Sequence, residues 1–416
     1  MVTVKPFKAI RPVRELAAQV AALPYDVLNS DEAREVVKDN PYSFLHVDKA
    51  EVDLDSSISL YDDKVYEKAK ENLQTLIEKH ILVQDTEESL YIYQLTMDGR
   101  TQTGLVGCTS VDEYMEGVIK KHEHTRPEKE VDRIRHVDTC DAHTGPIFLT
   151  YREKKQIQNV LNEWIQTNQP VYDFTADDSI THTVWVIDDR KVVETITLAF
   201  SDVDSLYIAD GHHRSASAVK VGLKRREQLG NYTGDEPFNY FLSVMFPDNE
   251  LHILDYNRIV SDLNGLSVSQ FIEQVSKAFT VKEAISTPYK SVEQHTFGMY
   301  VDGKWYELQA KEGTFDGIHP VERLDVSILQ NTLLTPILGV QDSRSDKRVD
   351  FVGGIRGLGE LEKLVDSGKA AVAFSMYPTA IQDLFAIADA KEVMPPKSTW
   401  FEPKLRSGLF IHSLSE

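Results

Sequence analysis

The sequence predicts an α+β protein with mixed β-sheets over its 416 residues. Three stretches alternate apolar and polar residues around a short polar turn, which is the pattern of a β-hairpin. Their turns fall at Asp98-Gly99, Asp188-Asp189 and Asp302-Gly303. Segments of helical periodicity lie between and beyond these stretches, so hairpins and helices are interspersed along one chain.

Helices are expected wherever apolar residues recur at a spacing of three and four. Gly230 follows one such segment and predicts its C-terminal end. The predicted helices cover residues 60–82, 152–167, 215–230, 267–279, 325–338 and 359–368. A chain of this length exceeds one ordinary core, and we place a boundary after Asn257, where the second β-rich stretch ends. The expected regions are therefore 1–257 and 258–416.

The charge balance excludes several classes of partner. Forty-five Lys and Arg residues against sixty-six Asp and Glu residues give a net charge of −21, which repels nucleic acids and anionic membranes. Two cysteines, Cys108 and Cys140, are too few for a disulfide scaffold and fit a reducing compartment. The sequence shows no signal peptide and no apolar run long enough to span a membrane. We expect a cytoplasmic protein without nucleic-acid or membrane partners.

Residues 207–222, YIADGHHRSASAVKVG, predict a buried strand, a tight turn and a helix. The first turn of a helix exposes unpaired N–H groups and a partial positive charge, so this turn can bind an anion. Arg214 adds a guanidinium suited to phosphate, and Ser215 opens the helical sequence. Asp210 could hold a magnesium ion against phosphate oxygens or orient a neighbouring donor.

A purely structural interpretation of this stretch stays open. Asp210 and Ser215 would then cap a helix while the histidines form local hydrogen bonds. A zinc site built from His212 and His213 is disfavoured, because adjacent ligands on a turn rarely point the same way.

A second cluster of ionisable residues lies within residues 118–151. Glu123 stands between His122 and His124, and Thr125 and Arg133 follow within a short distance. A carboxylate in such a setting can accept the proton of a hydroxyl held within hydrogen-bond reach, as a general base does. The alternative is a polar surface loop that leads into a charged helix.

The C-terminal stretch EVMPPKSTWFEPKLRSGLFIHSL forms a third candidate. Two prolines stiffen the chain before Lys397, Ser398 and Thr399, whose ammonium and hydroxyl groups suit phosphate contacts. Taken alone, a terminal strand and turn with outward charges explains the stretch better.

Together these segments resemble known families. The stretch YIADGHHR is similar to the phosphate-contacting signature of ParB/sulfiredoxin-like nucleotide-binding proteins, in the D-G-H-x-R form found in free-serine kinases. KKHEHT occupies the chain position of the upstream H-E pair of those kinases. Nearly the whole chain resembles the domain-of-unknown-function family ten-fifteen, through LPYDVLNSDEAREVVKDNPYSFLHV, GPIFLTY, LDVSILQNTLLTPILGV and the C-terminal stretch.

The resemblance implies a ParB/sulfiredoxin-like core, enlarged by N- and C-terminal additions, within residues 1–257. It implies a kinase that transfers a phosphoryl group from ATP or ADP, with Mg²⁺, to the hydroxyl of free L-serine. Glu123 and Asp210 would be catalytic, and phosphates would bind at Gly211, His212, His213, Arg214 and Ser215. His122, Thr125, Arg133, Lys397, Ser398 and Thr399 are further expected contacts, the last three from a tail returning to the site.

Two other functions remain open for the same anion site. One is hydrolysis of a nucleotide, and the other is a regulatory protein that senses a nucleotide or an amino acid without turnover. Both would bind the nucleotide at the mouth of the helix, so only a product assay separates them from a kinase.

Overall fold

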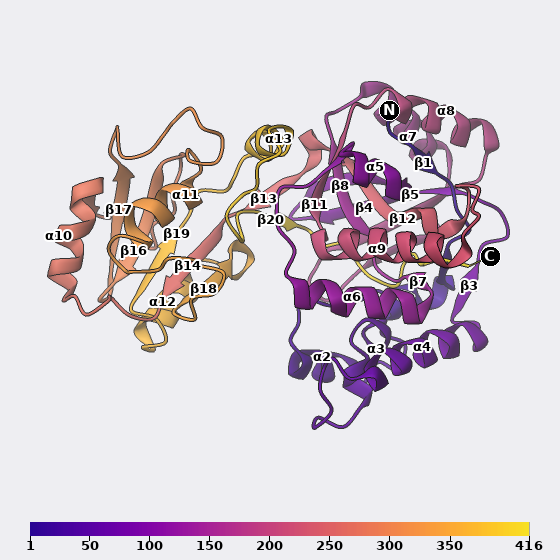
Figure 1. Cartoon of the computed structure of the whole chain (residues 1–416), viewed down its shortest axis with the longest axis horizontal. Coiled ribbons are helices and arrows are strands. Elements are labelled where there is room, and N and C mark those ends of the chain that lie inside the picture. Colours follow the sequence, from indigo (N-terminus) through magenta and orange to yellow (C-terminus); the bar gives the residue numbers. More distant parts are fainter. Residues whose placement is uncertain (416) are drawn as a thin grey trace. The chain divides into compact units, whose positions relative to one another are not determined.

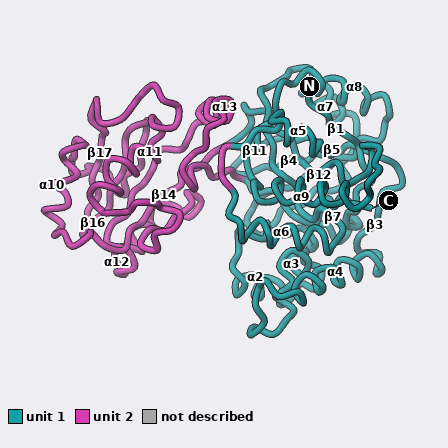
Figure 2. Tube along the Cα trace, viewed as in Figure 1, with its two compact units in different colours: residues 1–121, 125–251, 403–416 teal, residues 122–124, 252–402 magenta. Residues whose placement is uncertain are grey.

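The computed structural model describes residues 1–415 as two compact units. Unit 1 comprises Met1–Lys121, Thr125–Leu251 and Pro403–Glu416, and unit 2 comprises His122–His124 and His252–Glu402 (Figure 2). Asn257, after which the sequence predicts a boundary, lies within strand β14 (Tyr256–Val260) of unit 2. The expected α+β class with several sheets is confirmed.

Unit 1 is built on a nine-stranded mixed sheet (Figure 1). Its strand order is β6-β11-β8-β12-β5-β4-β10-β9, and β1 pairs with β5. The β11–β6 and β12–β8 pairs are parallel, whereas the other pairs are antiparallel. The strands are β1 (Val4–Lys5), β4 (Leu90–Met97), β5 (Arg100–Ser110), β6 (Ile119–Lys120), β8 (Ile147–Tyr151), β9 (Tyr172–Thr175), β10 (Thr181–Ile187), β11 (Leu206–Asp210) and β12 (Tyr240–Pro247).

Helices and two short ribbons complete unit 1. One ribbon pairs β2 (Ile10–Pro12) with β3 (Leu82–Gln84), and the other pairs β7 (Ala142–His143) with β21 (His412–Ser413). The helices are α1 (Ala17–Val20), α2 (Ser30–Val37), α3 (Leu45–Asp48), α4 (Asp63–Glu78), α5 (Val111–Glu116), α6 (Pro127–Cys140), α7 (Lys155–Thr167), α8 (Arg190–Ser201) and α9 (His212–Leu229).

Several apolar cores support unit 1. The larger core packs β-sheet residues such as Tyr151 against Ile196 of α8 and Val219 of α9. The second core lies among the N-terminal helices, where Phe44 and Leu73 pack with Cys140 of α6. Figure 1 shows α6 and α9 side by side, and they pack against each other along their length. This packing places the charged helix that follows the H-E-H stretch beside the helix that follows the D-G-H-H-R turn.

Unit 2 contains a six-stranded antiparallel sheet with the order β15-β17-β16-β19-β14-β18 and a ribbon of β13 with β20. The remaining strands are β13 (His252–Leu254), β15 (Phe279–Glu283), β16 (Thr296–Val301), β17 (Lys304–Ala310), β18 (Val349–Gly353), β19 (Val372–Ser375) and β20 (Trp400–Glu402). The helices are α10 (Val268–Ala278), α11 (Asp325–Leu329) with a π-helical turn at Gln330–Leu334, α12 (Gly359–Asp366) and α13 (Ile381–Asp389). None of the helices within residues 1–415 is long and apolar enough to cross a bilayer.

Two of the three predicted hairpins are confirmed. β4 and β5 are joined at Asp98-Gly99, and β16 and β17 at Asp302-Gly303, with positive φ at all four turn residues. The hairpin predicted at Asp188-Asp189 is wrong. The Asp189 carboxylate accepts hydrogen bonds from the N–H groups of Lys191 and Val192 at 2.8 and 3.1 Å and caps α8 instead.

Candidate functional site

The predicted strand, turn and helix at residues 206–229 are confirmed. β11 ends at Asp210, Gly211 adopts φ 94° and ψ 31°, and α9 begins at His212. The Ser215 N–H donates to the Gly211 carbonyl at 2.9 Å and closes the first helical turn. The helix dipole places a partial positive charge at this end of α9, which favours an anion there.

Arg214 folds back across this turn. A Cβ atom on Gly211 would lie 3.1 Å from Nε of Arg214, so glycine leaves room for the guanidinium as well as for the left-handed backbone. The guanidinium donates to the carbonyl of Pro146 and lies 3.4 Å from the Asp210 carboxylate. Its charge is thereby fixed beside the mouth of α9.

Lys404 brings a second cation to the same carboxylate. Its ammonium lies 3.6 Å from Asp210, and its side chain is only 12% exposed. Lys404 lies in the C-terminal stretch that the sequence offered as a candidate, but the sequence alone did not identify it as a residue of the site. Lys404 belongs to the segment Pro403–Glu416, which returns to unit 1 after the chain has completed unit 2.

A hydrogen bond within unit 1 joins the residues after the H-E-H stretch to the first turn of α9. The backbone N–H of Arg126 donates to Nε2 of His213 at 3.0 Å. Beside it, the Thr125 hydroxyl donates to Glu130 at 2.6 Å, and Lys220 of α9 pairs with the same Glu130 carboxylate. Burial opposes the charge of Glu130, but its hydrogen bonds to Lys220 and Thr125 lower its pKa. The residues that directly follow the H-E-H stretch therefore lie at the first turn of α9.

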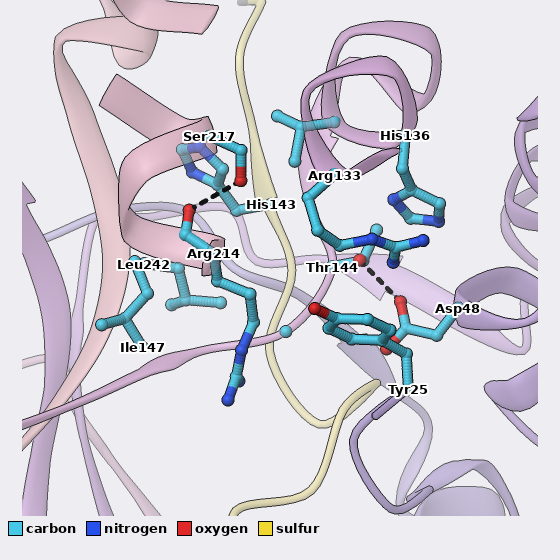
Figure 3. Close-up of a pocket in the computed structure, with 12 residues that line it drawn as sticks. Tyr25, Asp48, Arg133, His136, His143, Thr144, Ile147, Arg214, Ser217 and Leu242 are labelled. Carbon is cyan, nitrogen blue, oxygen red and sulfur yellow. Dashed lines mark hydrogen bonds between the residues drawn. The ribbon is translucent and has the colours of Figure 1, made fainter. Parts of the chain in front are cut away.

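A polar pocket also lies in unit 1, lined by residues of α3, α6 and α9, of strands β7, β8 and β12, and of the loops that carry Tyr25 and Thr144 (Figure 3). Asp48, Tyr25 and Arg133 are grouped on one side of it, and Arg214 lies on the other. Asp48 accepts a 2.7 Å hydrogen bond from the Thr144 hydroxyl. Arg133 was expected as a substrate contact, whereas Tyr25 and Asp48 were not anticipated.

Arg133 is charged and buried. Its Nε donates to Asp132 at 2.9 Å, and its guanidinium lies 4.1 Å from the centre of the Tyr25 ring. Burial lowers the pKa of the guanidinium, but the neighbouring Asp132 and Tyr25 raise it, and the resulting pKa lies above the ordinary value. Burial also raises the pKa of Tyr25, so this side chain is a neutral phenol at physiological pH.

His122, Glu123 and His124 are assigned to unit 2, together with Lys397, Ser398 and Thr399. The Met394 N–H donates to the His122 carbonyl at 2.8 Å, so the loop before Lys397 contacts the H-E-H stretch. The Ser398 hydroxyl donates to Pro395 at 2.6 Å, and the Lys397 ammonium lies 5.6 Å from the Tyr256 ring centre.

Arg258 is a charged neighbour of this loop that the sequence did not reveal. It is 4% exposed and donates to the Pro396 carbonyl at 3.2 Å. Burial lowers its pKa to about 10, so it remains a cation at neutral pH. Its position within a β-rich stretch gave no sign of a site.

The expected magnesium ligand does not form a metal site with its neighbours. Asp210 faces Arg214 and Lys404, and both cations compete with a metal ion for its carboxylate. Within residues 1–415, no three His, Cys, Asp or Glu side chains gather as metal ligands. These residues therefore do not fit a magnesium site held by the protein alone.

Several solved structures are similar to the chain at low identity. A conserved hypothetical protein from Pyrococcus furiosus shares 14% identity, with 74% of this chain and 95% of that chain covered and a TM-score of 0.35. A free serine kinase in complex with AMP shares 13%, covering 74% and 92%, with a TM-score of 0.35. SbnI from Staphylococcus aureus with a C-terminal truncation shares 12%, covering 74% and 87%, with a TM-score of 0.32.

A family model matches most of the sequence. No curated protein matches the sequence. A family model described as a protein of unknown function, DUF1015, matches residues 4–327. That range includes the H-E-H stretch, the mouth of α9 and nearly all of unit 1 except its C-terminal segment. The match spans more than half of the sequence, and the chain belongs to the DUF1015 family.

Proposed function

We propose that this protein is a small-molecule kinase that transfers a phosphoryl group from ATP or ADP to the hydroxyl of free L-serine. The observation that carries the proposal is the 3.0 Å hydrogen bond from the Arg126 N–H to His213. It ties the segment that follows Glu123 to the D-G-H-H-R turn. A carboxylate base and an anion-binding helix mouth are the two parts that phosphorylation of a hydroxyl requires.

The mouth of α9 would hold the phosphates. The helix dipole favours negative charge there. Arg214 and Lys404 add two cations beside Asp210, while His212, His213 and Ser215 belong to the same turn. Because the charge of the transferred phosphoryl group spreads over its oxygens, fixed donors of this kind stabilise the transition state.

Glu123 would act as the general base. The Oγ atom of serine forms the new bond to phosphorus, the bond from phosphorus to the bridging oxygen of the nucleotide breaks, and the Glu123 carboxylate takes the hydroxyl proton. The products are O-phospho-L-serine and ADP or AMP. Glu123 precedes Thr125 by two residues, so the chain allows at most about 7.2 Å between their Cα atoms. Thr125 in turn lies next to the residue that contacts His213.

We also infer the fold of unit 1 and the compartment in which the protein acts. We infer that unit 1 has a ParB/sulfiredoxin-like core, on the strength of the D-G-H-H-R turn between β11 and α9. Cys108 and Cys140 are buried free thiols, as a reducing compartment maintains them. We place the protein in the cytoplasm, where nucleotides and free serine are both available, with Lys397, Ser398 and Thr399 as further phosphate or substrate contacts.

The test is a phosphate-transfer screen read by mass spectrometry. The full chain is incubated with ATP or ADP, supplied as magnesium salts, and with L-serine, L-threonine or L-homoserine. We expect O-phospho-L-serine to accumulate together with the nucleotide product. Release of inorganic phosphate without a phosphorylated amino acid would identify a hydrolase instead. Tight nucleotide binding by calorimetry with no product of either kind would identify a sensor.

A further inference from the structure

The polar pocket of unit 1 adjoins the mouth of α9 through Arg214, which lies across Gly211 and also lines the pocket. Gly145 separates the two charged ends of the pocket. A Cβ atom on Gly145 would lie 3.8 Å from Nη1 of Arg214 and 3.9 Å from Oδ2 of Asp48. An Arg214 nitrogen and an Asp48 oxygen therefore both lie near Gly145, as does the Ser407 hydroxyl, which would be 2.9 Å from that Cβ atom.

Asp48 is a buried carboxylate with spare capacity to accept hydrogen bonds. It is 5% exposed, and the Thr144 hydroxyl is its one hydrogen-bond donor among residues 1–415. Its carboxylate takes part in no ion pair within that range, although Arg133 and Arg214 line the same pocket. A buried carboxylate is stabilised when a cationic donor supplies its missing partners.

Arg133 and His143 also have side-chain nitrogens that form no hydrogen bond within residues 1–415. The Nε atom of Arg133 donates to Asp132, and its terminal nitrogens donate to no other residue within 1–415. Both ring nitrogens of His143 are buried without a hydrogen-bond partner in the same range. Burial, followed by the nearby His412, lowers the pKa of His143 well below its ordinary value, so the ring is neutral. Unsatisfied polar groups of this kind are typical of a place that a polar ligand fills.

We propose that this pocket binds the α-ammonium and α-carboxylate groups of the amino acid acceptor, with Asp48 selecting the ammonium and Arg214 the carboxylate. The inference rests on the proposed function and names the subsite that makes the enzyme specific for an amino acid. The two charges of such a zwitterion are separated by one carbon atom and match the opposite charges that Gly145 separates. Arg214 places this subsite directly beside the phosphate-binding turn.

The pocket has a small enclosed part and a larger open part. The cavity itself measures about 20 Å³, enough for a group the size of a water molecule, within about 400 Å³ of unfilled space that is partly open to solvent. The enclosed part admits one charged group, and the rest of the acceptor would lie in the part that is open to solvent. A serine within a polypeptide lacks the free ammonium and carboxylate groups, so the charges of the pocket favour a free amino acid.

The test compares L-serine with two acceptors that each lack one of its charged groups. L-Serine carries both groups, 3-hydroxypropionate lacks the ammonium and ethanolamine lacks the carboxylate. The variant Asp48→Asn keeps the hydrogen bond from Thr144 and removes the charge. We expect it to raise the KM for L-serine at least tenfold, to leave the KM for the nucleotide unchanged and to have no effect on 3-hydroxypropionate. Asp138→Asn on α6, where Lys224 and Arg225 of α9 pair with the carboxylate, is the matched control and should leave all three constants unchanged.

Calorimetry with L-serine keeps this test separate from that of the kinase activity. Serine binding that weakens in Asp48→Asn and persists in Asp138→Asn would support the subsite even if no phosphoserine forms. An equal KM for L-serine in wild type and Asp48→Asn, with turnover intact, would overturn the subsite and leave the kinase proposal standing. Equal serine affinity of the two proteins by calorimetry, or no heat of binding in the wild type, would also overturn it.

Discussion

The ammonium of Lys404 lies 3.6 Å from the carboxylate of Asp210, joining the end of the chain to the turn where β11 becomes α9. Asp210 would repel a phosphate if it stood alone at this turn. Lys404 and Arg214 neutralise it and leave an excess of positive charge at the helix mouth. The C-terminal segment thereby contributes a charge that the D-G-H-H-R sequence lacks.

Replacing Lys404 by Met should weaken nucleotide binding. A charge-assisted contact with phosphate contributes about 1.5–3 kcal/mol, so the Kd for ADP should rise roughly 10- to 100-fold. Isothermal titration calorimetry measures this change. Lys79→Met, at the exposed C-terminal end of α4, removes the same charge elsewhere and should leave Kd unaltered. Equal Kd values for the wild type and Lys404→Met would show that the lysine serves only to neutralise Asp210.

Replacing Glu123 by Gln should abolish turnover while nucleotide affinity is retained. The amide keeps the shape of the side chain but cannot accept the hydroxyl proton, and loss of a general base costs about 10²- to 10⁴-fold in kcat. Phosphoserine formation and ADP binding are measured on the same preparation. Glu116→Gln, an exposed carboxylate at the end of α5, is the control. Unchanged kcat in Glu123→Gln would remove this residue from the mechanism.

Gly211→Ala should impair nucleotide binding more than it impairs folding. Alanine at φ 94° is strained, at a cost of about 1–2 kcal/mol, and its Cβ would push the Arg214 guanidinium away from the turn. Gly234 has φ 98°, and a Cβ atom added there would have no neighbour within 4 Å, so Gly234→Ala carries the backbone strain alone. Urea unfolding should give similar losses of stability for both variants. The affinity for ADP should fall only in Gly211→Ala, and equal affinities would contradict the assigned role of Arg214.

Acidification should destabilise the protein through His412. Burial lowers its pKa to about 4, below the value of about 6.5 in an unfolded chain. The unfolded state therefore binds more protons, and stability present above pH 6.5 is lost as the pH falls toward 4. Between pH 7 and pH 5 this histidine should cost about 2 kcal/mol of unfolding free energy.

Urea titrations at the two pH values measure that loss. The variant His412→Gln can still donate to the Pro237 carbonyl, which accepts from His412 at 3.0 Å, but it does not titrate. Its stability should change less between the two pH values than that of the wild type. His80→Asn, at an exposed position with φ 55°, should retain the full loss. Identical pH dependence in wild type and His412→Gln would contradict the prediction.

Local features of the fold were predictable because their determinants are adjacent in the sequence. Gly211 between an apolar strand and a helix-forming segment predicts the β11–α9 turn, and Asp98-Gly99 predicts the β4–β5 turn. The Asp188-Asp189 pair failed as a hairpin turn because the same residue type caps helices. Asp189 accepts two backbone hydrogen bonds at the start of α8, and the apolar residues that follow fit a helix as well as a strand.

The pocket was less predictable because its residues come from distant segments. Arg133 stood out within a dense cluster of charges, whereas Tyr25 and Asp48 are separate polar residues among the N-terminal helices. They meet Arg133 only when α3 and α6 pack in the second core. The one available signal was the resemblance of residues 23–47 to the family, which identifies a segment but assigns no chemistry to its side chains.

The order of the units along the chain constrains the order in which they can fold during synthesis. Unit 2 is inserted between Leu251 and Pro403 of unit 1, and the last segment of unit 1 supplies strand β21 and Lys404. During synthesis, all of residues 252–402 leave the ribosome before the chain that completes the first unit. The inserted unit is therefore free to fold first, while its host awaits the final strand and the cation that completes its phosphate-binding turn.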